Sequence, residues 1–289
     1  MSSGVATGPL TSLETVVLED EKTRARVVIA PGRGGMVTRF EIDGAAVLYL
    51  DTATLVDETK NVRGGNPVLF PSPGPLAGDR FTRAGRSGSM KQHGFARQRA
   101  WTAVGGTSSS EVTLELVSDD ATRAQFPWDF RARIRYSLAG TTLSVETRVE
   151  NTGADPLPFS LGFHPYFSIA DAAKARASIA TDATRGWDNV TKTVVGVKGP
   201  IDLTAKEVDM HLYDHTGGSA TLDRGTDRIV VSGDPEFGRW VIWTLAGKDF
   251  VCVEPWTSGA DALNTGEGLL MLSPGEAKTL TVRMSVERA

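Results

Sequence analysis

The 289-residue sequence holds one cysteine and four histidines. A single cysteine cannot form an intramolecular disulfide, which excludes a small secreted domain held together by disulfides. The same shortage leaves no zinc-finger spacing. No run of 18 apolar residues is present, so we expect no transmembrane helix. The opening segment lacks the basic and apolar regions of a signal peptide, and we predict that residues 1–10 are a disordered tail of a cytoplasmic protein.

The sequence also lacks a strong excess of charge of one sign. Lysine and arginine total 31 and aspartate and glutamate total 35, which gives a formal net charge of −4. This mild acidity argues against nucleic acid or an anionic membrane as the main partner. The hydrophobic fraction of 40% is ordinary for a globular protein. Length alone leaves one large domain or two small ones, and a chain of this size buries roughly three quarters of its unfolded surface, so a large core is available.

Apolar residues recur with a period of two through much of the chain. In Phe130–Leu138 apolar residues alternate with arginine and serine, which predicts a strand with one exposed face. Thr142–Glu150 repeats this alternation, and the three residues between the two segments predict a hairpin turn. Further strands are expected at Arg26–Ile29, Val37–Ile42, Glu111–Val117, Arg228–Ser232, Trp240–Leu245, Phe250–Glu254 and Leu280–Val286.

Helical periodicity is nearly absent, and only Ala170–Ile179 predicts a short helix. The shortage of helices excludes a TIM barrel or a Rossmann fold, because both need a helix after most strands. No internal repeat is visible, which argues against a propeller. We therefore predict an all-β fold, an antiparallel sandwich or barrel. Asn61–Phe95 is the longest stretch without alternation, and such irregular segments are usually functional or mobile.

One histidine and one glutamate each end an apolar extended run, and each precedes a proline. His164 lies in LGFHPYF, where Leu161 and Phe163 alternate away from it. The alternative is a hydrogen-bonded histidine of an aromatic core. Glu254 lies in FVCVEPWT, and burial there would raise its pKa towards the range of a general base. The alternative is a glutamate that reaches water. We hypothesise that the two side chains meet as an acid/base pair.

The other histidines lie in less distinctive surroundings. His93, in KQHGFARQRAW, is close in sequence to Gln92 and Arg97, which indicates either a cluster of hydrogen-bond donors or a solvated basic loop. His211 and His215 have a spacing that metal ligands can use on a helix. Their segment has no helical apolar face and no third ligand nearby, so we interpret both as surface histidines. We expect no metal site and no cofactor.

Four segments carry a resemblance to a known family: Val62–Pro71, Gln92–Trp101, Leu161–Phe167 and Val251–Glu276. In sequence, order and spacing they resemble the aldose 1-epimerase (mutarotase) superfamily, and most of all its hexose-6-phosphate 1-epimerase-like branch. An early segment, Pro31–Gly44, fits the first strands of that family. The resemblance runs over nearly the whole chain and implies one large antiparallel β-sandwich domain over residues 11–289.

The resemblance also implies roles for individual residues. His164 matches the general acid that protonates the ring oxygen of the sugar. Glu254 matches the general base that takes the proton from the anomeric hydroxyl, so that α and β anomers interconvert by ring opening and closure. Arginine suits a sugar phosphate because its planar fork gives bidentate, charge-assisted bonds. The substrate-binding positions that the resemblance implies are Arg63, Gln92, His93, Arg97 and Asp188.

The identity of the sugar, and whether it is phosphorylated, stays open. Ser72–Gly74 and the pair Thr244–Leu245 depart from the pattern of the phosphate branch. A dense basic segment indicates either a solvated loop or an electropositive entrance for a sugar phosphate. Its residues are Arg63, Arg80, Arg83, Arg86, Lys91, Arg97 and Arg99.

Two other functions fit the same fold. The first is a non-catalytic carbohydrate-binding protein. The second is a glycoside hydrolase, which needs two carboxylates about 5 to 9.5 Å apart. Asp188 and Asp261 are the candidates for a second carboxylate beside Glu254.

Overall fold

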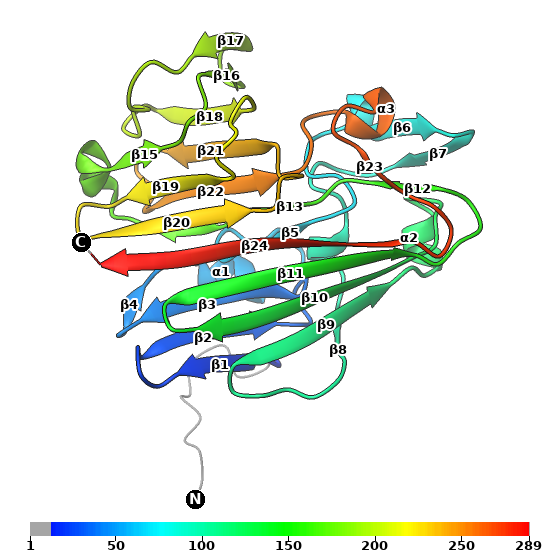
Figure 1. The fold of residues 1–289 in the computed structure, drawn as a ribbon, viewed down its shortest axis with the longest axis horizontal. Coiled ribbons are helices and arrows are strands. Elements are labelled where there is room, and N and C mark those ends of the chain that lie inside the picture. The colour runs from blue at the N-terminus through cyan, green and yellow to red at the C-terminus, as the bar shows by residue number, and fades with distance from the viewer. Residues whose placement is uncertain (1–12, 289) are drawn as a thin grey trace, which may run out of the picture.

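The structure, a computed structural model, describes residues 13–288 (Figure 1). The predicted tail over residues 1–10 lies outside the described residues. Every pairing between two named strands is antiparallel, which confirms the predicted all-β antiparallel architecture. In the part of the chain that the structure describes, no helix is long and apolar enough to cross a membrane.

Two large sheets make up most of the protein. The back sheet consists, in spatial order, of β15 (Ser178–Ala180), β19 (Ser219–Asp223), β20 (Asp227–Gly233), β24 (Ala277–Arg288), β11 (Thr142–Asn151), β10 (Phe130–Ala139), β9 (Glu111–Val117) and β8 (Thr102–Ala103). The site sheet consists of β17 (Thr193–Gly196), β16 (Arg185–Asp188), β18 (Glu207–Leu212), β21 (Arg239–Leu245), β22 (Phe250–Trp256), β13 (Gly162–Phe163) and β5 (Val68–Leu69), with β14 (Tyr166–Ser168) paired to β22.

Smaller elements complete the fold. A four-stranded sheet contains β1 (Val16–Asp20), β2 (Ala25–Ala30), β3 (Met36–Ile42) and β4 (Ala45–Ala46), and two further pairs are β6 (Arg80–Arg83) with β7 (Arg86–Ser89) and β12 (Leu157–Phe159) with β23 (Leu270–Leu272). The short helices are α1 (Thr52–Val56), α2 (Asp120–Arg123) and α3 (Ala262–Thr265), and the 3₁₀ turns are Ala77–Asp79, Ala96–Gln98 and Asp171–Arg176.

The hairpin of β10 and β11 shows why the period of two predicts this fold. Alternate residues of β10, among them Ile134 and Tyr136, are fully buried in the core. The arginines between them face solvent, where Arg133 and Arg135 form ion pairs with glutamates of the neighbouring β9. Such cross-strand pairs add modestly to the stability of a sheet whose main support is the buried face. All the predicted strands exist, with ends that differ by at most three residues.

The predicted helix over Ala170–Ile179 is wrong. The segment forms a 3₁₀ turn over Asp171–Arg176 and then β15, whose Ile179 is buried and lies opposite Leu222 of β19. Alanine-rich composition favours a helix, but the segment has no apolar stripe that a helix could bury. Strand pairing instead buries Ile179 and gives the backbone of residues 178–180 cross-strand partners, so tertiary packing overrides local propensity here.

Strand β22 is buried along its whole length, and this explains where the candidate site residues lie. Val251 and Val253 point into the core that the site sheet shares with the back sheet. Successive side chains of a strand point to opposite faces, so Cys252 and Glu254 point to the other side. Asn61–Phe95, predicted without clear alternation, contains β5, β6 and β7. The pocket side of β22 is covered by residues 61–63 and 92–97, which together we call the covering segment.

The covering segment is fixed against β5 at a glycine. Gly94 has φ +66°, and a Cβ at this position would collide with the carbonyl oxygen of Phe70. That same oxygen accepts hydrogen bonds from the backbone N–H groups of Phe95 (3.1 Å) and Ala96 (3.2 Å). The close approach therefore needs glycine both for its backbone conformation and for the space.

We predict that Gly94→Ala lowers the free energy of unfolding by about 2–4 kcal/mol. This is the sum of the cost of alanine in a left-handed backbone conformation and the cost of the backbone shift that the new Cβ forces. Gly105→Ala is the matched control, because Gly105 has φ +81° but nothing within 4 Å of the added Cβ. The control should lose only about 1 kcal/mol. Urea denaturation of both variants measures the difference, and equal losses would contradict the role of the Phe70 contact.

Candidate active site

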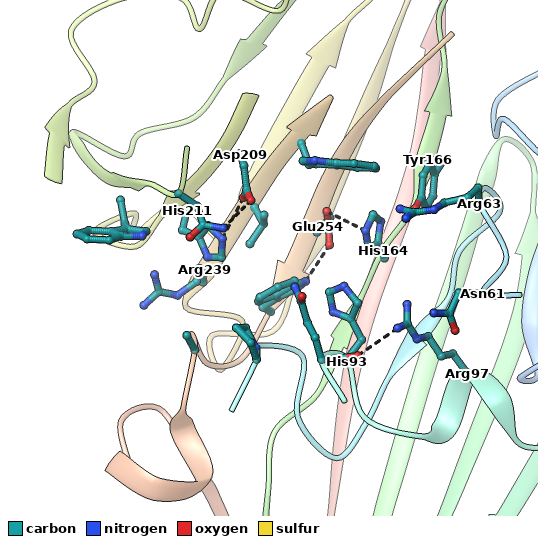
Figure 2. Close-up of a pocket in the computed structure, with 18 of the residues that line it drawn as sticks. Asn61, Arg63, His93, Arg97, His164, Tyr166, Asp209, His211, Arg239 and Glu254 are labelled. Atoms are coloured by element: carbon teal, nitrogen blue, oxygen red, sulfur yellow. Dashed lines mark hydrogen bonds and ion pairs between the residues drawn. The ribbon is translucent and has the colours of Figure 1, made fainter. Parts of the chain in front are cut away.

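A pocket of about 570 Å³ lies on the side of the site sheet that faces away from the core (Figure 2). Its floor comes from β18, β21 and β22, and one wall comes from the covering segment. The pocket brings six of the predicted site residues together: Arg63, Gln92, His93, Arg97, His164 and Glu254.

Strand register places the floor residues in rows. Glu254 pairs with Val241, which in turn pairs with His211. Cys252 and Asp209 both pair with Trp243, in the next row. Because residues two apart on a strand share a face, the sheet presents a fixed set of side chains to the pocket. These are Asp209 and His211 of β18, Arg239, Val241 and Trp243 of β21, and Glu254 and Trp256 of β22.

His164 and Glu254 form a close pair at the centre of this floor. His164 Nε2 lies 3.5 Å from Glu254 Oε1, and the two residues are only 7% and 1% exposed. The indole N–H of Trp256 donates to Glu254 Oε2 at 3.1 Å, which fixes the carboxyl group from its other side. The His164 ring stacks on Tyr166 with ring centroids 4.5 Å apart. The predicted meeting of the two side chains is therefore present in the structure.

Burial shifts the pKa values of this pair towards each other. Desolvation raises the pKa of Glu254 well above its ordinary value, and the negative charge of Asp209 adds to the rise. Desolvation lowers the pKa of His164, and the nearby His93 and Arg97 lower it further. The rise at Glu254 disfavours the fully deprotonated state, and the fall at His164 disfavours the doubly protonated state. The pair therefore holds one proton at neutral pH.

His93 is held as a neutral ring with a fixed orientation. Its Nδ1 lies 2.7 Å from the carbonyl oxygen of Pro73, and since a carbonyl only accepts, Nδ1 carries the proton. Desolvation and the charge of Arg97 lower the pKa of His93 to about 3. The unprotonated Nε2 is thus a hydrogen-bond acceptor. The ring lies edge-on to His164, with centroids 5.5 Å apart.

Two guanidinium groups of the covering segment reach the pocket without a carboxylate partner. The Arg97 guanidinium donates to the backbone oxygen of Gln92 at 3.1 Å, and burial lowers its pKa to about 10, so it stays charged. The Arg63 guanidinium lies 5.8 Å from the centre of the Trp243 ring. Among residues 13–288, neither forms an ion pair with an acidic side chain.

Most of the basic segment does not face the pocket. Of the seven residues singled out, only Arg63 and Arg97 line it. Arg86, Lys91 and Arg99 form ion pairs with carboxylates outside it. The positive character of the pocket therefore comes from fewer residues than the sequence suggests.

Asp188 does not join the other predicted site residues. Its carboxylate accepts hydrogen bonds from the backbone N–H of Val190 (2.8 Å) and from the hydroxyl of Thr191 (2.8 Å), so it closes the turn after β16. Asp261, the other candidate for a second carboxylate, accepts from the backbone N–H of Ala77 and also lies outside the pocket lining.

The pocket carboxylate that the sequence analysis missed is Asp209. Asp209 Oδ1 lies 3.2 Å from His211 Nε2, and the side-chain amide of Asn189 donates to Asp209 Oδ2 at 2.6 Å. These hydrogen bonds lower the pKa of Asp209 against the opposing effect of burial. The interpretation of His211 as a surface residue is wrong, because β18 lies inside the sheet and leaves His211 only 7% exposed. His215 is half-buried and lies over Trp240.

One group of possible metal ligands includes the central pair. Within residues 13–288, ligand atoms of His164, Cys252 and Glu254 lie within 4.8 Å of one another. Burial raises the pKa of the Cys252 thiol, which therefore stays protonated, whereas metals bind the thiolate. Cys252 also lies behind the pocket lining.

Comparisons with known proteins agree with this architecture. A structure of the Slr1438 protein of Synechocystis sp. PCC 6803 superposes with a TM-score of 0.92 at 37% identity, over 96% of each chain. A structure described as galactose 1-epimerase of Lactobacillus acidophilus shares the fold at 15% identity, with a TM-score of 0.77 over 96% of this chain and 95% of that one.

Sequence comparison adds relatives with named activities. A protein of Cenchrus ciliaris described as "Putative glucose-6-phosphate 1-epimerase" is 30% identical over 249 residues, which are 77% of this chain and 72% of the relative. An Escherichia coli protein with the same description is 25% identical over 85% of this chain and 83% of its own length. The family model for aldose 1-epimerase matches residues 15–285. With this match over nearly its whole length, the chain belongs to the aldose 1-epimerase family.

Proposed function

We propose that the protein is a mutarotase that interconverts the α and β anomers of an aldose, with an aldose 6-phosphate as its preferred substrate. The observation that carries the proposal is the buried pair of His164 Nε2 and Glu254 Oε1, 3.5 Å apart on the floor of the pocket. Mutarotation needs one group that gives a proton to the ring oxygen and one that takes a proton from the anomeric hydroxyl. A pair that shares a single proton can do both.

The reaction follows from the proton balance of the pair. In the ionic form, Glu254 takes the proton of the anomeric hydroxyl while His164 protonates the ring oxygen, and the bond between C1 and the ring oxygen breaks. The pair then holds its proton on Glu254. The open-chain aldehyde rotates about the C1–C2 bond, and the hydroxyl on C5 attacks the other face of C1. His164 takes the proton of that hydroxyl, and Glu254 protonates the new anomeric oxygen.

Other pocket residues would hold the sugar during this exchange. The neutral Nε2 of His93 accepts from a sugar hydroxyl beside His164. Asp209, oriented by His211 and Asn189, accepts from hydroxyls on the far side of Glu254. These steps require proton transfer alone, so the proposal assigns no cofactor.

A phosphate on the sugar is supported by Arg63 and Arg97. Both are charged, both lack an acidic partner among the described residues, and they lie on the same wall of the pocket (Figure 2). Arginine binds phosphate through charge-assisted hydrogen bonds that are stronger than neutral ones. The names of the relatives from Cenchrus ciliaris and Escherichia coli agree with this choice.

The first test removes the proposed base. Glu254→Gln is expected to lower the mutarotation kcat for glucose 6-phosphate about 10²- to 10⁴-fold, the usual contribution of a general acid or base. Exchange between the anomeric proton signals in NMR spectra measures the rate. Glu287→Gln, an exposed position on β24, is the matched control and should keep the wild-type rate. A Glu254→Gln variant that exchanges the anomers within threefold of the wild-type rate would overturn the proposal. If the wild type binds sugar but exchanges its anomers no faster than the variant, a non-catalytic carbohydrate-binding protein is favoured.

The second test uses pH. The raised pKa of Glu254 keeps the shared proton on the pair as pH rises, until that pKa is passed. The lowered pKa of His164 prevents a second protonation as pH falls, until pH is well below the ordinary histidine value of 6.5. We therefore expect kcat at saturating glucose 6-phosphate to be flat around neutral pH and to fall on both sides. An acid limb with its midpoint at or above pH 6.5 would contradict the assignment.

The third test concerns the phosphate. Arg97→Gln is expected to lower the kcat/KM ratio of glucose 6-phosphate to glucose by about 10- to 100-fold, because it removes a charge-assisted hydrogen bond. Arg148→Gln, exposed on β11, is the control. If both sugars lose the same factor, Arg97 binds the ring and not the phosphate.

A further inference from the structure

Arg239 lies at the end of the pocket opposite Arg63 and Arg97 (Figure 2). It is the first residue of β21, and its guanidinium lies 5.3 Å from the centre of the Tyr213 ring. On another side it packs on Gly259, where an added Cβ would lie 2.9 Å from an Arg239 Nη atom. Gly259 is therefore needed for the space that the guanidinium occupies. The ring and the glycine together hold the group in one place.

The donors of this fixed guanidinium have no protein acceptor. Within residues 13–288, Arg239 forms no ion pair with a carboxylate and its side chain makes no hydrogen bond to another residue. The nearby Glu267 is exposed and forms no ion pair with it. Asp209 lies in the row of Trp243, away from Arg239, and is already held by His211 and Asn189. None of the Arg239 nitrogens is among the buried polar atoms of residues 13–288 that lack a partner, so these donors open into the pocket, where an oxyanion of a ligand can accept from them.

The two cationic ends of the pocket are too far apart for one phosphate. Arg239 and Trp243 are four residues apart on β21, and a strand rises about 3.3 Å per residue, which separates their backbones by ~13 Å. The Arg63 guanidinium lies over Trp243. Val241, midway between them, pairs with Glu254. The proton-transfer pair therefore lies between an end with Arg63 and Arg97 and an end with Arg239.

We propose that Arg239 forms a second anion-binding subsite of the same pocket and that the preferred substrate is a reducing sugar with two oxyanion groups. The proposal rests on the mutarotase function for the orientation of the sugar. With a C6 phosphate at Arg63 and Arg97 and C1 at Glu254, carbons 2 and 3 lie across the ring from C6. A substituent on C2 or C3 that ends in a carboxylate or a phosphate reaches Arg239, whose planar fork binds either group.

The experiment compares two sugars that differ only in the lactyl ether that carries the second oxyanion. N-acetylmuramic acid 6-phosphate carries a lactyl carboxylate on O3, and N-acetylglucosamine 6-phosphate lacks it. The wild type is expected to favour the first by about 10- to 100-fold in kcat/KM, the factor of a charge-assisted hydrogen bond. Arg239→Gln should reduce this ratio to near one. Gly259→Ala should reduce it in the same direction, because the new Cβ displaces the guanidinium. Arg283→Gln, exposed on β24, should keep the wild-type ratio.

Three results would overturn the subsite: no preference in the wild type, a preference that survives Arg239→Gln, or an equal loss for both sugars.

Titration with inorganic phosphate separates this failure from a failure of the mutarotase function. The titration is followed through the Nε–H NMR signals of labelled arginine. The signals of Arg239 and Arg97 should saturate at different phosphate concentrations, which gives two binding events, and Arg239→Gln should remove only one of them. Two events in a protein without mutarotation would retain the subsite and reject the enzyme. A single event that Arg239→Gln leaves intact would reject the subsite.

Discussion

The burial of a carboxyl group next to an imidazole is the constraint on which this site depends. A single charge at Glu254 would be strongly destabilised inside the sheet, and so would a single charge at His164. Together they can share one proton without a net charge. The surrounding structure keeps that balance: the indole of Trp256 orients the carboxyl group, and the ring of Tyr166 stacks on the imidazole. The chemistry and the cost of burial are two aspects of the same arrangement.

This arrangement requires a strand that is covered on both faces. β22 packs on the core through Val251 and Val253, and it presents Glu254 to the pocket from the opposite face. The covering segment can lie close to the sheet because Gly94 allows backbone contact with Phe70. A sheet with one wet face, such as the β10–β11 hairpin side of the molecule, would leave the same glutamate in water with an ordinary pKa.

The sequence predicts those parts of the structure that depend on local pattern. Alternation predicts β9, β10 and β11 because their exposed faces are truly polar. The same alternation exists in β18, but there the polar residues Asp209 and His211 face the pocket, and the pattern alone does not distinguish a pocket from solvent. Arg239 could not be predicted at all. Its setting depends on Tyr213 and Gly259, which come together only through the fold.

The two kinds of site residue come from different parts of the architecture. Glu254 belongs to a central strand whose neighbours are fixed by sheet register, whereas Arg63 and Arg97 belong to the irregular segment laid over it. Under the proposed function, substitutions in the covering segment change which sugars bind while the pair of His164 and Glu254 and its strand stay as they are. A single scaffold of this type can therefore diversify its substrate range stepwise, with each intermediate retaining the same reaction.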